Sequence, residues 1–244
     1  MLTAKDSSVL RALFDAESSP ASSGHARLDP TLPSFPVVPE HHIDALRSRE
    51  LAAVRKIQQS NDESVIEGAV ADLDTLISEY PLYPSAYANR AQALRLLSQA
   101  RGERNGEDDD DHTLFIAGNT DIATRLFTDL GRAISLSAPA APREKVSPTQ
   151  ARLLADAYTH RGYLLLKAAK LKGNGELKEG PRQLLEVESK DMLEEMASRD
   201  FFRGGWYGNK LAQQLSVRTN PYAKMCGAIV KEALKKETED HYSV

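Results

Sequence analysis

The feature that most constrains this chain is a pair of similar stretches, "AYANRAQALRL" at residues 86–96 and "AYTHRGYLLLK" at 157–167. In both, a tyrosine, an arginine, a small residue and a leucine follow one another at intervals of three, one and three residues. Such intervals place the four side chains on one face of an α-helix. The two sets are Tyr87, Arg90, Ala91 and Leu94, and Tyr158, Arg161, Gly162 and Leu165. Self-similarity of this kind is typical of helical repeats, in which each unit buries its apolar face against the next.

The composition also favours helices. Alanine, leucine, glutamate, lysine and arginine are abundant, whereas runs of β-branched residues are almost absent. The abundant types are strong helix formers, and the β-branched types are those that favour strands. We therefore predict an all-α fold with helical stretches at roughly 41–60, 63–79, 85–100, 119–137, 148–170, 187–204 and 209–237.

The chain divides into three regions. We expect an N-terminal region over 1–40, a body of three repeats over 41–218 and a C-terminal capping helix over 219–244. The N-terminal region begins with a short amphipathic helix at 7–14. The Ser- and Pro-rich stretch after it is predicted to be an extended linker, because closely spaced prolines exclude continuous helix or sheet. A ligand for a proline-recognising module is the alternative for this stretch.

Two insertions interrupt the repeats, at 101–117 and 170–186. The first contains four adjacent aspartates, Asp108 to Asp111, whose mutual repulsion predicts a solvated loop. A calcium-binding loop would need alternating oxygen ligands and a fixed glycine, and these aspartates provide neither. The second insertion is rich in glycine and predicts a connector.

Charge and cysteine content bear on the class of protein. The net charge of −4 argues against nucleic acid as the main partner, because phosphate binding needs clustered positive charge. The single cysteine, Cys226, cannot form an internal disulfide and fits a reducing compartment. The sequence has neither a signal peptide nor an apolar run of about 18 residues, so we expect a cytoplasmic protein that does not bind membranes.

The repeated stretches resemble the tetratricopeptide repeat family, whose units are helical hairpins with aromatic, large and small residues at these positions. In that frame the first repeat runs from about Glu50 to Tyr83, the second begins at Pro84, and the third contains Tyr158. The resemblance implies a tetratricopeptide-type α-solenoid of three helical hairpins. Small residues such as Gly162 would then let the two helices of a hairpin approach closely.

A closer resemblance extends over nearly the whole chain. The segments "SVLRALF", "SAYANRAQALRL", "RDFF" and "NPYAKMC" are similar to those of the tetratricopeptide repeat protein 36 family. The resemblance implies a small cytosolic binding protein that is not an enzyme and has no cofactor. It also implies links to tyrosine metabolism and to heat-shock chaperones of the seventy-kilodalton class. We therefore expect another protein or an extended peptide as the partner.

In such a fold the first helices of the hairpins line a concave groove. The candidate peptide-binding residues are Asn89, Gln92, Arg95, Thr159, His160 and Tyr163. Because burying an unpaired amide is costly, Asn89 either hydrogen-bonds the backbone of a bound peptide or bonds neighbouring helices. Both alternatives remain open at the level of sequence.

A carboxylate clamp, as used by chaperone-binding members of the family, is not expected. That clamp consists of two asparagines, two lysines and one arginine, and only Asn89 matches the set. Asp156 and His160 stand where the second lysine and the arginine belong, and an aspartate would repel a ligand carboxylate.

Three further residues carry structural predictions. Arg90 and Arg161 stand at equivalent positions, where we expect the aliphatic stem to pack along the hairpin and the guanidinium to reach a carboxylate or a helix end. Trp206 follows two glycines at a point where a helix must end or bend, and we expect it to fill the core.

The leading hypothesis is a non-catalytic protein–protein interaction scaffold. Paired carboxylates, a nucleophile with its base and a phosphate-binding loop are all missing at suitable spacing, so we predict no catalytic and no metal-binding residues. The alternative is a self-occluded structural or regulatory subunit of a metabolic enzyme complex. In that case the groove would be filled by the apolar side chains of the first helix, Val9, Leu10, Leu13 and Phe14.

Overall fold

The computed structural model describes residues 25–104, 112–141 and 144–220, and this part of the chain is helical, as predicted. It contains no β-strand, only an isolated bridge between Leu28 and Val146. A 3-10 turn spans His112–Phe115 and a single short turn, α7, spans Arg182–Leu185. The longer helices are α2 (Glu40–Gln59), α3 (Glu63–Glu79), α4 (Pro84–Arg104), α5 (Thr120–Ser137), α6 (Pro148–Asn174), α8 (Lys190–Trp206) and α9 (Lys210–Thr219).

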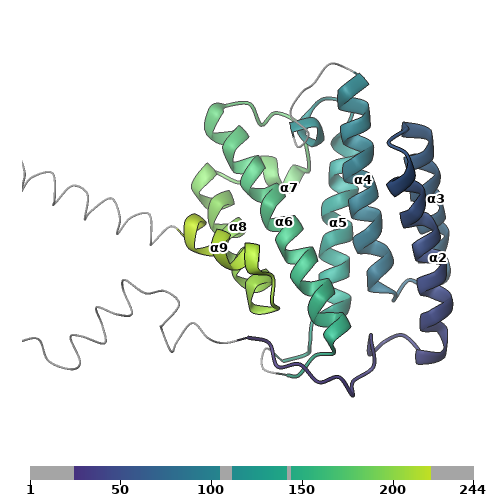
Figure 1. The fold of residues 1–244 in the computed structure, drawn as a ribbon. Helices are drawn as coiled ribbons and strands as arrows, with labels where there is room; N and C mark the ends of the chain where they lie inside the picture. The colour runs from purple at the N-terminus through teal and green to yellow at the C-terminus, as the bar shows by residue number, and fades with distance from the viewer. Residues whose placement is uncertain (1–24, 105–111, 142–143, 221–244) are drawn as a thin grey trace, which may run out of the picture.

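Each long helix packs mainly on its neighbours in the chain. The pairs α2 and α3, α4 and α5, and α6 and α8 form three successive hairpins, and α9 packs on α8 (Figure 1). In addition, α2 contacts α4 and α4 contacts α6, so the first helices of the three hairpins are adjacent. A side-by-side order of this kind places one face of α4 and one face of α6 opposite each other.

An ion pair joins the two helices of the second hairpin, and an equivalent one joins the two helices of the third. Arg90 on α4 binds Asp129 on α5 through two hydrogen bonds of 2.7 and 2.6 Å, and Arg161 on α6 binds Asp200 on α8 through bonds of 2.7 and 2.8 Å. Each guanidinium also lies 5.6 Å from the centroid of the tyrosine ring three residues earlier. The predicted role of both arginines, packing along the hairpin and reaching a carboxylate, is confirmed.

Close helix packing depends on glycines in the third hairpin. A Cβ atom at Gly162 would lie 3.1 Å from the ring of Phe201, which confirms the predicted need for a small residue there. At Gly204 a Cβ would lie 2.7 Å from Thr159 Oγ1 and 3.1 Å from the Cβ of Ala212. Gly204 therefore marks the point where α6, α8 and α9 meet.

Residues 25–39, here called the N-terminal strap, cross the ends of several helices (Figure 1). The backbone amide of Ala26 donates to the carbonyl of Trp206 over 2.9 Å. Further along, Ser147, which caps the start of α6, donates its hydroxyl to the carbonyl of Ser34 over 3.0 Å. The ring of Phe35 is 2% exposed and lies edge-on to Tyr83, with 5.7 Å between centroids. The prolines exclude helix here as predicted, but the segment packs against the helices instead of serving only as a spacer.

The boundaries of the two insertions differ from the prediction. Helix α4 continues to Arg104, and Arg101 within this extension pairs with Glu63 and Glu67 on α3 at 2.8 Å each. At the other end of the first insertion, the residues from Thr113 to Phe115 are buried and not solvated. Helix α6 continues to Asn174 and ends at Gly175, whose φ of 75° terminates the helix.

Some predictions fall outside the described residues. These are the helix at 7–14, the aspartates at 108–111, Cys226 and nearly all of the capping helix at 219–244. Trp206 is described: it is the last residue of α8, as the two glycines before it predicted, but it is half-buried and outside the hydrophobic core, so the prediction that it fills the core is wrong.

Candidate functional site

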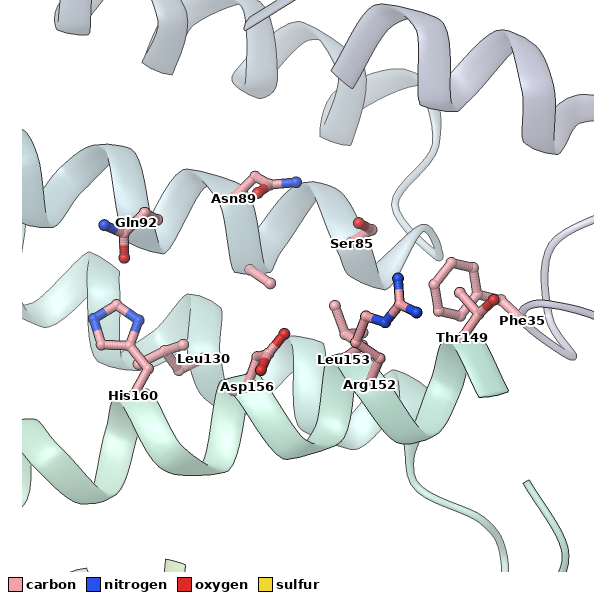
Figure 2. A pocket seen from close by; sticks show the side chains of 12 residues that line it. Phe35, Ser85, Asn89, Gln92, Leu130, Thr149, Arg152, Leu153, Asp156 and His160 are labelled. Carbon is pink, nitrogen blue, oxygen red and sulfur yellow. The ribbon is translucent and has the colours of Figure 1, made fainter. Parts of the chain in front are cut away.

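A pocket of about 350 Å³ opens between α4 and α6 (Figure 2). The residues from α4 recur at intervals of three, one and three, and those from α6 recur at intervals of three and one, so each set forms one helical face. The lining residues are Phe35 from the strap, Ser85, Ala88, Asn89 and Gln92 from α4, Leu130 from α5, and Thr149, Arg152, Leu153, Asp156, Ala157 and His160 from α6.

Three of the six predicted groove residues meet at this pocket, namely Asn89, Gln92 and His160. Figure 2 shows Gln92 on α4 above His160 on α6, with both side chains facing the gap between the helices. The lining also contains one cationic and one anionic side chain, Arg152 and Asp156, one turn apart on α6. The pocket can therefore offer hydrogen bonds, both charges and an apolar floor to a bound group.

The other three predicted residues lie elsewhere. Thr159 lies on the side of α6 that packs against α8: its hydroxyl donates to the carbonyl of Ala155 one turn earlier on α6 over 2.6 Å, and a Cβ at Gly204 of α8 would lie 2.7 Å from its Oγ1. Tyr163 lines a second pocket of about 440 Å³ between α6 and the start of α8. Arg95 is half-buried one turn beyond Gln92 and is not part of either lining.

Asn89 bonds a neighbouring helix, which was one of its two predicted alternatives. Its amide donates to the carboxylate of Glu50 on α2, and the hydroxyl of Ser85 donates to the same oxygen. The hydroxyl of Tyr83 donates to the other carboxylate oxygen over 2.7 Å. Burial, with the nearby carboxylate of Glu50, raises the pKa of Tyr83 far above its ordinary value, so this hydroxyl keeps its proton and acts as a donor.

Glu50 itself was not identified from the sequence as a site residue, although a signal for it exists. On α2 the buried side chains recur at intervals of three and four residues, and Glu50 is the one charged member of that stripe: Ile43, Leu46, Glu50, Ala53 and Ile57. A carboxylate at an inward position must find donors, because burying it unpaired costs several kcal/mol. Residue spacing could thus have indicated a buried carboxylate, but not the identity of its donors.

Comparison with known proteins gives a relative with the same extent. The L-tyrosine degradation gene cluster protein hmgX of Aspergillus fumigatus is 56% identical over 247 residues, which cover 98% of this chain and 94% of the relative. This chain belongs to the hmgX family. No family model matches the chain, and no solved structure matches it. The name of the hmgX relative agrees with the link to tyrosine metabolism that the resemblance to the tetratricopeptide repeat protein 36 family implied.

Two further properties of this hmgX family member concern metal ions and membranes. Among the described residues, no group of three or more His, Cys, Asp or Glu side chains is placed to hold a metal ion. Within the same residues, no helix is both long enough and apolar enough to cross a bilayer.

Proposed function

We propose that this protein is a non-catalytic scaffold of the tetratricopeptide type, which acts in tyrosine degradation by binding another protein at the pocket between α4 and α6. The observation that carries the proposal is this pocket, whose walls are single faces of two adjacent first helices. Its lining mixes apolar, amide and charged side chains, which is the composition that a peptide segment of a partner needs.

The repeat assignment is supported by the equivalent hairpins. The Tyr87, Arg90 and Asp129 arrangement recurs as Tyr158, Arg161 and Asp200. Stacked hairpins of this kind bury a continuous core and leave the first helices to line a surface. The role in tyrosine degradation is supported by the name of the relative that is 56% identical over almost the whole chain.

A heat-shock chaperone is one partner that this proposal includes. Binding by a carboxylate clamp is disfavoured, because Asn89, the one residue that matches such a clamp, already bonds Glu50. We therefore propose that a chaperone, if it is the partner, contacts another part of the surface.

One observation favours a second function, a regulatory subunit that covers its own pocket. Phe35 of the N-terminal strap forms part of the pocket lining, so a segment that precedes the helices already occupies one end of it. In such a subunit the partner would bind at this end of the pocket only after the strap moves.

The test combines binding with growth. Gln92→Ala with Asp156→Ala removes two polar groups from the pocket, and Gln59→Ala with Glu195→Ala is a matched pair outside its lining. In cells that degrade L-tyrosine, we expect the wild type and the control pair to retain the same bound protein and to support growth on tyrosine. The pocket pair should lose both. Equal capture and growth with all three forms would contradict the proposal, as would turnover of tyrosine or its breakdown products by the purified protein.

A further inference from the structure

The carboxylate of Glu50 is held in a cage of neutral donors. Glu50 is 7% exposed, and its two oxygens accept hydrogen bonds from Tyr83, Ser85 and Asn89. The donors come from the turn before α4 and from its first turns, whereas Glu50 comes from α2. Within the described residues, no ion pair includes Glu50. The negative charge is therefore stabilised by donor geometry and not by a cation.

Two of the three donors also belong to the lining of the pocket. These are Ser85 and Asn89 on α4, so the cage borders the α4 side of the pocket (Figure 2). If Glu50 were absent, two hydroxyls and an amide would point at one vacant position the size of a carboxylate. Convergent donors of this kind can bind a carboxylate, because together they supply N–H and O–H protons to both of its oxygens.

We propose that Tyr83, Ser85 and Asn89 form a carboxylate-binding site that Glu50 fills from within the chain. Glu50 thereby excludes the carboxylates of a partner from this side of the pocket, and a partner carboxylate reaches Asn89 only when α2 withdraws. The part that concerns a partner rests on the proposed function, whereas the carboxylate-binding site does not. Glu50 thus determines the specificity of the pocket, because it keeps other carboxylates away from Asn89.

The competing explanation is that these hydrogen bonds only hold α2 against α4 and have no role in binding. If the role is purely structural, Glu50→Ala should be unstable in any buffer, because the three donors would lose an acceptor that nothing else replaces. A carboxylate-binding site would instead accept a free carboxylate in the space that Glu50→Ala opens. Acetate is the probe, and sodium chloride at the same ionic strength is its control.

We expect acetate to raise the Tm of Glu50→Ala by roughly 2–4 °C above the chloride control, since a ligand that binds only the folded state stabilises it. The wild type and Glu50→Gln, in which the cage stays filled, should show no difference between the two salts. Glu79→Ala removes an exposed carboxylate bound to Arg49 and controls for general effects of acetate.

A second readout follows the Asn89 side chain directly. Its amide NH₂ resonances should shift on acetate addition in Glu50→Ala and stay unchanged in the wild type. Adding Asn89→Ala or Ser85→Ala to Glu50→Ala should weaken the acetate effect. The proposal is overturned if Glu50→Ala gains nothing from acetate, if it stays unfolded in acetate, or if Glu79→Ala gains as much. None of these outcomes involves a partner, so they leave the scaffold proposal to its own test.

Discussion

Arg90 and Asp129 lie 39 residues apart and meet through two parallel hydrogen bonds, and Arg161 and Asp200 lie 39 residues apart and meet in the same way. In the second and third hairpins, the first helix is thus fixed to the second at equivalent points. The pKa of Arg90 lies above its ordinary value, because the hydrogen bonds to Asp129 and Asp74 outweigh the burial that acts to lower it. The guanidinium therefore remains charged at neutral pH.

Replacing Arg90 by leucine should be strongly destabilising. The side chain of Asp129 is 2% exposed and would lose its cation, which costs about 3–5 kcal/mol for a buried pair. Urea denaturation measures this loss. Arg199→Ala breaks an exposed pair with Glu195 and should change stability by less than about 0.5 kcal/mol. Similar losses for the two variants would show that the buried pair has no special role.

Gly204→Ala should destabilise the junction of α6, α8 and α9. The added Cβ would lie 3.2 Å from the carbonyl of Ala155 and closer still to Thr159, so backbone must move, at a cost of about 1–3 kcal/mol. Gly131→Ala in α5 meets nothing within 4 Å and should stabilise by roughly 0.5–1 kcal/mol, as alanine does in a helix. Thermal denaturation measures whether each variant has a higher or a lower Tm than the wild type. A stabilised Gly204→Ala would contradict the packing described here.

Phe35→Ala should detach the N-terminal strap. Truncating a phenyl ring that is 2% exposed costs about 3–5 kcal/mol, and the ring is also part of the pocket wall. Limited proteolysis should then cut within residues 25–39 much faster than in the wild type. Val37→Ala, at a residue that is 45% exposed in the same segment, is the control and should be cut at the wild-type rate.

Asp29 should titrate at low pH. Hydrogen bonds from Thr31, together with the hydrogen bond and charge of Lys145, lower its pKa from 3.8 to about 2. A carboxyl whose folded pKa is depressed stabilises the fold above its unfolded pKa, and this contribution is lost as pH falls from about 4 to about 2. Carbon NMR of the Asp29 carboxyl measures the value directly. Thr31→Ala should raise this pKa more than Lys145→Ala does, and an unchanged value in both variants would refute the assignment.

Much of the helical structure could be predicted because it depends on local spacing. The intervals around Arg90 and Arg161 fixed their helical face, and the chemistry of arginine required a carboxylate within reach. The identity of that carboxylate depends on how hairpins pack, which spacing does not report. Phe35 shows the same limit: prolines around it removed any periodic pattern, so nothing in the sequence marked its ring as buried.

The candidate site was predicted in part for the same reason. Asn89, Gln92 and His160 lie on the faces that the repeat frame indicated, and these faces do meet at a pocket. Thr159 is adjacent to His160 in sequence, but its side chain lies on the side of α6 that packs closely against Gly204 of α8. It therefore does not reach the pocket. Glu50 was missed because its donors belong to another hairpin.

The hydrogen bond between Ala26 and Trp206 has a consequence for how this protein loses its structure. In a linear array, each hairpin contacts only its neighbours, and an array can unravel from one end while the rest persists. Here the strap leads from the end of the third hairpin back to the start of the first, so neither end can separate without breaking contacts at the other. The three hairpins should therefore melt in a single cooperative transition, and the strap, which brings together residues far apart in the sequence, should slow folding relative to an open array of the same helices.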